Sequence, residues 1–391
     1  MTRGGREAEG RRAVALRAAC SLLAAGFGLV LLRVPLPGLT PSLREAFEAG
    51  QLPAAGLAAG MVHAFLLAQL LVEVVAAAVP AFRAERTDGG PGRRRLALWA
   101  IAGAALLCGL DLANADASTE MVLARVGAVA AALGAARWGA LNGLFHPLQA
   151  WVLWSLLTPV GLELTGQLDH GLPTRLALGP DPYPTLAYFV LTLVVQATPL
   201  DLKRRGTHFV PLPLSSLLPV LLALALPAVP GIGGAFESPW AQASVAVILA
   251  LAVARWGWPW GLHNAPEVFT TARTLTALFI GGMAFIEAAR PPDDPYSPLA
   301  AVVLAAFVGD LVAEVRFRLR HPNAVCIARW SRVGRLPELY EALDRARIPF
   351  TVRHRRQRSL WHVAAPHLEM EVLVAAERAP EAERRLDSLR G

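Results

Sequence analysis

Charge is scarce in this sequence of 391 residues, and lysine is nearly absent. Charged residues make up 17% of the chain, well below the roughly 25% that is usual for a soluble domain. Lys203 is the single lysine, so arginine supplies almost all of the basic excess behind the net charge of +7. We attribute this bias to a GC-rich genome, and we expect no nucleic-acid partner except rRNA met through a ribosome.

The sequence also lacks the cysteine and histidine patterns of metal sites and disulfide frameworks. Cys20, Cys108 and Cys326 lie far apart, and two of them fall inside apolar runs, which excludes a disulfide framework. The histidines in or near the apolar runs do not pair at metal-ligand spacing. HExxH, GxSxG and Walker motifs are absent. We therefore predict a protein that is not an enzyme and that has no cofactor and no metal.

Long apolar runs are what the sequence has in abundance. Hydrophobic residues form 54% of the chain, and runs of about 20 residues, the length that crosses a bilayer as a helix, recur along most of it. We predict an all-α polytopic membrane protein with ten transmembrane helices. The predicted spans are 13–32, 54–79, 96–112, 121–138, 145–162, 184–200, 212–229, 240–257, 269–289 and 298–317.

Basic residues in the short loops set the predicted orientation, because cytoplasmic loops are enriched in arginine and lysine. With the N-terminus inside, the outer segments carry only Arg33, Arg44, Arg175 and Arg290. The inner segments carry most of the others, in clusters such as the one at 93–95. An even number of spans then places both termini in the cytoplasm.

The character of the sequence changes at about His321, and residues 321–391 read as a small soluble α+β domain. Its pattern is strand, helix, strand, strand, helix, with Leu339, Leu343 and Ala346 on one helical face. This order predicts a ferredoxin-like unit, whose small core favours docking on a partner or on the membrane domain. The basic run RHRRQR, residues 353–358, reads as a hairpin tip that faces lipid headgroups or, alternatively, rRNA or a protein.

Ionisable side chains inside the predicted spans are few: Glu73, Arg125, Asp310 and Glu314. Arg125 lies one turn from the outer end, where it can reach water or pair with Asp116. The three carboxylates lie near inner ends, where Arg83 or Arg316 can neutralise them. None lies at a midplane helix break, which is the position that a proton-coupled carrier needs.

The most informative stretch is LLRVPLPGLTPSLREAFEAG, residues 31–50. Arg33 ends the first apolar helix, and Pro35 and Pro37 prevent its continuation, because proline has a fixed φ and no N–H. Ser42 and Glu45 then have the spacing of a capping box for a new helix. That helix is too short and too charged to span, so we expect it to fold back between the spans.

Five stretches in this order resemble the channel subunit of the Sec translocon, SecY in bacteria, and the likeness extends over residues 13–320. They are RVPLPG with PSLREAFEAG, AQLLVEVVAAAVP with GGPGRRRLALW, RWGALNG, LKRRGTHFVPLPLSSLLPVLLA, and AAVVLAAFVGDLVAEV. The resemblance implies a channel domain over 1–320 with two pseudo-symmetric halves, the first at about 13–162 and the second at about 184–317. It implies a passive protein-conducting channel or membrane insertase subunit in the bacterial cytoplasmic membrane.

The resemblance also implies roles for particular residues and partners. The plug is expected at Pro41, Ser42, Leu43 and Phe47. The lateral gate is expected at Gln69, Ser215 and Ser216. The contact with cytosolic partners is expected at Lys203, Arg204, Arg205, Arg255 and Arg273. The expected partners are a polypeptide substrate, membrane lipid, small Sec accessory subunits, a ribosome or motor ATPase, and an unknown ligand of the C-terminal domain.

The sequence departs from the family pattern in ways that leave other functions open. The motif Ile-Pro-Gly-x-x-Pro-Gly after the eighth span is missing, and the loop from Arg255 to Arg273 is short. Ser215 and Ser216 replace an expected asparagine, and the region after His321 is not a usual feature of the family. Two alternatives therefore remain: a small-molecule secondary transporter of unrelated origin, and a non-conducting SecY-derived scaffold that recruits a partner through its C-terminal domain.

Overall fold

The fold was analysed in a computed structural model of the whole chain. The structure describes residues 3–48, 55–83, 85, 91–115, 117–153, 183–197, 200–202, 206–208, 217–228, 233–256, 266–290, 297–330, 336–361 and 369–390. The chain divides into two compact units. The first comprises Met1–Val152, Val315–Asn323 and Ala364–Leu368, and the second comprises Leu153–Glu314, Ala324–Val363 and Glu369–Gly391. The predicted domain boundary at residue 321 stays a prediction.

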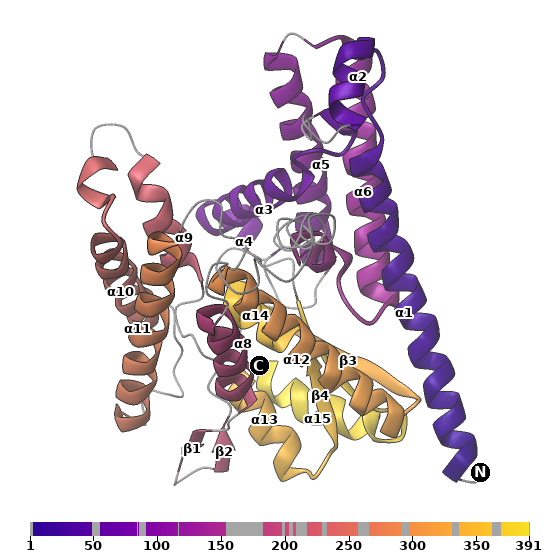
Figure 1. The fold of residues 1–391 in the computed structure, drawn as a ribbon. Coiled ribbons are helices and arrows are strands. Elements are labelled where there is room, and N and C mark those ends of the chain that lie inside the picture. The colour runs from indigo at the N-terminus through magenta and orange to yellow at the C-terminus, as the bar shows by residue number, and fades with distance from the viewer. Residues whose placement is uncertain are drawn as a thin grey trace, which may run out of the picture. The chain divides into compact units, whose positions relative to one another are not determined.

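The first unit is a group of helices (Figure 1). Its helices are α1 (Arg3–Arg33), α2 (Pro41–Glu48), α3 (Met61–Ala78), α4 (Pro80–Arg83), α5 (Pro91–Asn114) and α6 (Thr119–Asn142). Helix α1 packs on α6, α6 on α5, and α5 on α3. The hydroxyl of Ser118 caps α6 by accepting from the backbone N–H of Met121 at 3.3 Å, which satisfies one of the free donors at the helix start.

Small side chains face inward in the first unit and large apolar ones face outward. The interior between α5 and α6 contains Ala100, Ala104 and Ala132, each fully buried, while Leu106 and Leu123 are 59% and 65% exposed. Soluble proteins rarely expose so much contiguous apolar surface. Small residues at helix contacts with large ones facing outward are typical of helices that pack in lipid.

The second unit contains a further set of helices and a short hairpin. Its elements up to residue 320 are α8 (Tyr183–Ala197), β1 (Leu200–Leu202), β2 (Gly206–His208), α9 (Leu218–Ala225), η3 (Leu226–Ala228), η4 (Gly233–Phe236), α10 (Pro239–Trp256), α11 (Pro266–Ala289) and the part of α12 (Pro298–Arg320) up to Glu314. Helix α10 packs along α11, and both contact α9. Strands β1 and β2 pair antiparallel, with Leu202 opposite Gly206.

The C-terminal residues of the second unit form a three-stranded antiparallel sheet with helices. The elements are β3 (Ala324–Trp330), α13 (Leu336–Arg345), β4 (Phe350–Arg353), α14 (Arg355–Trp361), β5 (Met370–Ala375), η6 (Ala376–Arg378) and α15 (Ala379–Arg390). The strand order is β3-β5-β4. All six residues of the central strand β5 are buried. Leu339 and Leu343, on the predicted apolar face of α13, are fully buried in this core, and Ala346 packs against it.

In the part of the chain that the structure describes, five helices are long and apolar enough to cross a membrane, which indicates a membrane-embedded protein. They are α1 from Glu9, α5, α6, α11 from Thr270, and α12. Shorter apolar helices lie within the predicted spans at 54–79, 184–200 and 240–257, whereas residues 154–162 of the fifth predicted span are outside the described residues. The total of ten spans therefore stays a prediction.

Candidate functional site

The loop between α1 and α3 is closed at its base by backbone hydrogen bonds. As predicted, α1 ends at Arg33. Pro35 forms an isolated antiparallel bridge with Gly56. The N–H of Leu36 donates to the carbonyl of Ala55 at 3.0 Å, and the N–H of Leu57 donates to that of Val34 at 2.7 Å. The chain segments 34–36 and 55–57, which lie on either side of α2 in the sequence, are therefore held together.

The short helix α2 lies within this loop and has no buried residue. Leu43 is 44% exposed, and Phe47 is half-buried. Pro41 occupies the first helical position, where its missing N–H costs nothing. The predicted capping role of Ser42 is wrong, because Ser42 lies inside α2 and the first turn closes from Arg44 N–H to Thr40 C=O at 3.0 Å.

Two glycines with positive φ lie close to the base of the loop. Gly38 has a φ of 75° and Gly60 has a φ of 77°, a conformation that side chains with a Cβ adopt only with strain. Gly38 turns the chain toward α2, and Gly60 immediately precedes α3. The loop thus has a base that is held by backbone hydrogen bonds and a helix, α2, that has no buried residue.

Arg125 on α6 holds the base of the loop from inside the first unit. Its side chain is only 3% exposed, and its Nη2 donates to the carbonyl of Gly56 at 2.9 Å. The prediction that Arg125 reaches water is therefore wrong, because a backbone carbonyl close to the helix supplies the acceptor instead. Asp116, its other predicted partner, lies outside the described residues.

Gln69, the predicted gate residue on α3, is buried. It is 2% exposed, and its Oε1 has no hydrogen-bond partner among the described residues. A buried acceptor without a donor destabilises the packed arrangement by about 1–3 kcal/mol. Such a group favours any rearrangement that brings a donor to it. Ser215 and Ser216, predicted to share this gate, lie outside the described residues.

Glu73 forms a buried ion pair within the first unit. It lies one turn after Gln69 on α3, and its carboxylate accepts from the guanidinium of Arg93 on α5. The prediction that an arginine neutralises Glu73 is correct, with Arg93 as a partner that was not foreseen, whereas the side chain of Arg83 lies outside the described residues. Arg93 belongs to the basic loop GGPGRRRLALW, so this motif ties two helices together.

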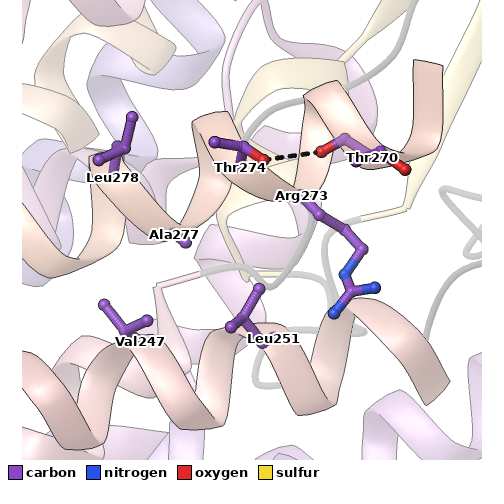
Figure 2. Close-up of a pocket in the computed structure, with 7 residues that line it drawn as sticks. All are labelled: Val247, Leu251, Thr270, Arg273, Thr274, Ala277 and Leu278. Carbon is purple, nitrogen blue, oxygen red and sulfur yellow. Dashed lines mark hydrogen bonds between the residues drawn. The ribbon is translucent and has the colours of Figure 1, made fainter. Parts of the chain in front are cut away.

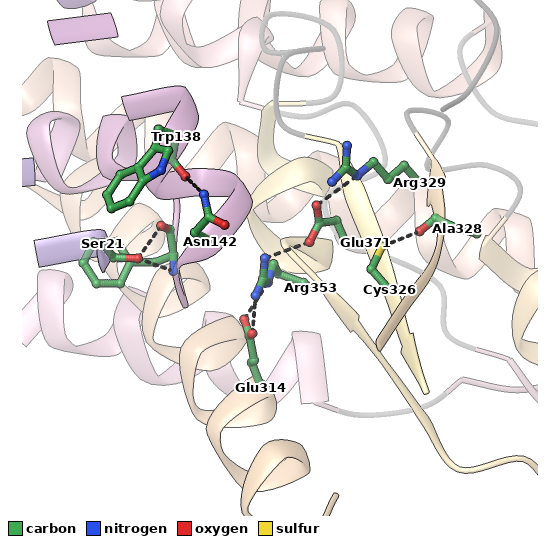
Figure 3. A network of polar contacts seen from close by, with 10 residues as sticks. Ser21, Trp138, Asn142, Glu314, Cys326, Ala328, Arg329, Arg353 and Glu371 are labelled. Carbon is green, nitrogen blue, oxygen red and sulfur yellow. Dashed lines mark hydrogen bonds and ion pairs between the residues drawn. The ribbon is translucent and has the colours of Figure 1, made fainter. Parts of the chain in front are cut away.

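A seam of small residues on α1 accommodates the segment that follows α6. The hydroxyl of Ser21 donates to Phe145 C=O at 2.9 Å and accepts from Phe145 N–H at 3.1 Å (Figure 3). The indole N–H of Trp151 donates to Ala25 C=O at 2.8 Å. A Cβ at Gly28 would lie 2.0 Å from that indole, and one at Gly143 would lie 1.9 Å from the Ser21 hydroxyl. The second glycine of RWGALNG is therefore required for helix packing.

In the second unit, a buried ion network joins α12 to the C-terminal sheet. Arg353 is 2% exposed, and it donates to both carboxylate oxygens of Glu314 and, at 2.7 Å, to Glu371 (Figure 3). Arg329 extends the network to the other oxygen of Glu371 at 3.1 Å. Burial alone would lower the pKa of Arg353, but the two carboxylates raise it above its usual value. Glu314 thus has its partner in the C-terminal region.

Asp310, one turn earlier on α12, binds the start of α14. Its two carboxylate oxygens accept from the backbone N–H groups of Arg356 and Gln357, each at 3.1 Å. The guanidinium of Arg356 donates to Gly309 C=O at 2.6 Å. The prediction that 353–358 forms an exposed hairpin tip is wrong, because Arg353, Arg355 and Arg358 are each less than 10% exposed. The carboxylates of α12 make this burial tolerable.

The residues predicted to meet cytosolic partners are only partly described. Lys203, Arg204 and Arg205 lie outside the described residues, and the side chain of Arg255 does too. The flanking strand β2 contacts α13, and Ala272 of α11 is buried in the C-terminal core. Within the second unit, the C-terminal sheet and its helices therefore contact the hairpin and the start of α11.

Arg273 lines a groove between α10 and α11. The other lining residues are Val247, Leu251, Thr270, Thr274, Ala277 and Leu278 (Figure 2).

Among the described residues, no group of three or more His, Cys, Asp or Glu side chains could hold a metal ion. Comparison of the sequence with models of known protein families and with curated proteins finds no match.

Proposed function

We propose that this chain is a translocon-like protein-conducting channel or membrane insertase subunit, in which α2 acts as the plug. The observation that carries the proposal is the loop between α1 and α3. Its base is fixed by the Pro35–Gly56 bridge and by Arg125, while α2 has no buried residue. A plug needs this combination, because it must leave its closed position without disrupting the helices that hold it.

The remaining parts of the mechanism belong to the same proposal. Apolar side chains would close the pore by excluding water, with Leu43 and Phe47 on the side of α2 that faces it. The buried Oε1 of Gln69, which has no hydrogen-bond partner among the described residues, lowers the cost of parting the helices at a lateral gate. The channel hydrolyses nothing, so a ribosome, a motor ATPase or partitioning of the polypeptide into lipid must supply the free energy.

The finer architecture belongs to the same proposal. We propose ten spans in two pseudo-symmetric halves, with both termini in the cytoplasm of a bacterial cell. The strand order β3-β5-β4 supports a ferredoxin-like C-terminal domain, because it places the parallel pair β3 and β4 on either side of β5, as in a split β-α-β unit. Accessibility of single cysteines to a membrane-impermeant thiol reagent would test the number of spans.

Site-specific crosslinking tests substrate passage. A photoreactive residue at Gln69 or Ser216 should crosslink to an arrested nascent polypeptide that carries a signal sequence. The same residue at Leu71, which is 50% exposed on α3, serves as the control and should crosslink mainly to lipid. Equal crosslinking from both positions of α3, or none from Gln69 and Ser216, would refute a lateral gate here.

Ion leak tests the plug. Deletion of residues 41–50 in the reconstituted protein should raise the conductance of the bilayer, because the segment that closes the pore is gone. Unchanged conductance in a protein that elutes as the parent does would remove α2 from the gate. A solute that stabilises the protein when a signal peptide does not would instead indicate a small-molecule transporter.

One observation favours a second candidate, a non-conducting SecY-derived scaffold. The C-terminal domain contacts β2 and α11, the region where cytosolic partners of a channel are expected to dock. A scaffold would capture a partner through this domain, and the plug deletion would cause no leak. The conductance measurement therefore separates the two candidates.

A further inference from the structure

We propose that the groove between α10 and α11 binds one phospholipid molecule, with its phosphate at Arg273 and an acyl chain along the apolar residues of the groove. The groove has a volume of about 430 Å³, which is within the range of small-molecule sites. Both helices belong to the same compact unit. This proposal is independent of whether the chain conducts polypeptides.

The lining changes from polar to apolar along the groove. Thr270, Arg273 and Thr274 line its first part, on the first turns of α11, and Ala277 and Leu278 follow one turn later (Figure 2). The distance from Thr270 to Leu278 is about 12 Å along the helix axis, at 1.5 Å per residue. A phospholipid has the same order of polar and apolar parts, because its phosphate is followed by hydrocarbon chains.

The opposite wall is apolar, and its helix stands close to α11 at one end. Val247 and Leu251 of α10 line the groove. A Cβ added at Gly281 would lie 2.6 Å from Val247 Cγ2, so the two helices touch there. One turn nearer Arg273, the small side chain of Ala277 leaves the space that an acyl chain would fill.

The surroundings favour a lipid over a soluble anion. Leu278, a lining residue, is 68% exposed, and nearby Ile248 and Leu275 are 66% and 43% exposed. Large apolar side chains exposed beside the groove on membrane-length α11 are expected to face hydrocarbon. A guanidinium matches phosphate oxygens through two parallel hydrogen bonds, and basic pockets between cytoplasmic ends of spans bind lipid headgroups.

Native mass spectrometry of the full-length protein, delipidated in detergent, tests the proposal. Titration with phosphatidylglycerol should load one tightly bound molecule, and diacylglycerol with the same chains should bind about tenfold more weakly, because it lacks the phosphate. Millimolar inorganic phosphate should not displace the phospholipid. Equal binding of diacylglycerol, or displacement by phosphate, would overturn the proposal.

Three variants locate the site. Arg273→Ala should weaken the tight binding about tenfold through loss of the charged donor, and Ala277→Phe should weaken it as much by filling the groove with Arg273 intact. Arg290→Ala removes an arginine at the other end of α11, where it pairs with Glu287 at 3.2 Å, and should leave binding unchanged. Unchanged binding in both groove variants, or equal loss in the Arg290 control, would overturn the site.

Discussion

Alanine is the commonest residue in the interior between α3, α5 and α6, whereas leucine is the commonest among the buried residues around the C-terminal sheet. On the outer surfaces the distribution is reversed, with leucine exposed in the first region and charged residues exposed in the second. Leu98, Leu106 and Leu123 face outward from the membrane helices, while Arg345 and Glu338 face outward from α13.

The difference follows from the solvent that each region meets. In water, burial of a large apolar side chain stabilises by about 1.5–3 kcal/mol, so leucines collect inside. In hydrocarbon that gain disappears, and close contact between helix backbones becomes the main source of stability. Four predictions test this comparison.

Replacement of Arg353 by alanine should have the largest effect. It leaves Glu314 and Glu371 buried without their shared cation, which destabilises by about 3–5 kcal/mol. Denaturant unfolding in detergent, followed by the fluorescence of tryptophan, measures the loss. The matched control is Arg345→Ala, because Arg345 pairs with Glu341 but its side chain is 77% exposed, so the change should be below about 0.5 kcal/mol. Similar losses in the two variants would refute a buried network.

Leucine-to-alanine substitution should then separate the two interiors. Leu339→Ala in the C-terminal core should cost about 2–5 kcal/mol, because it leaves a cavity. Leu71→Ala on α3, where the leucine is 50% exposed, should cost much less in the same unfolding measurement. A larger loss at Leu71 would contradict an outward-facing position in lipid.

Two glycines on α1 should respond differently to the same added side chain. A Cβ at Gly28 would collide with Trp151, whereas at Gly26 nothing lies within 4 Å. Gly28→Val should therefore destabilise by about 1–3 kcal/mol, and Gly26→Val should be close to neutral. Melting temperatures in one detergent would compare them, and equal shifts would argue against a tight seam.

The smallest change in stability is expected at α2. Substitution of Leu43 and Phe47 by serine removes apolar surface that is not fully buried, so unfolding should change by less than about 0.5 kcal/mol, as for surface sites. The ion conductance of the reconstituted channel should nevertheless rise. A large loss of stability together with unchanged conductance would make α2 a structural element instead of a plug.

Local patterns in the sequence predicted the helices well and their long-range partners poorly. The end of α1 at Arg33 follows from proline chemistry, and the strand at 324–330 was predictable from its apolar residues, both of which act over a few residues. The partners of Asp310 and Glu314 lie 39 to 47 residues away along the chain. A window of a few residues does not contain both partners of such a contact. The sequence therefore could not show that the basic run 353–358 is buried.

The candidate sites show the same limit. A helix in the stretch 41–48 was predictable from Pro41 and the charges that follow it, but the Pro35–Gly56 bridge beneath it was not, because it joins two segments without a strand pattern. Arg273 was predicted as a contact for cytosolic proteins from the family resemblance and its place at the end of a short loop. Its position in a groove depends on the packing of α10 against α11, which the sequence does not state.

The network around Arg353 also affects the order of folding events during synthesis of the chain. A ribosome adds about 5–20 residues per second, and Glu314 precedes Arg353 by 39 residues. For roughly 2–8 s after its synthesis, the end of α12 therefore waits for Arg353, to which Glu314 is bonded in the folded chain. During that interval the helix depends on water or on the insertion machinery, and it reaches its final state only when the last strands have been made.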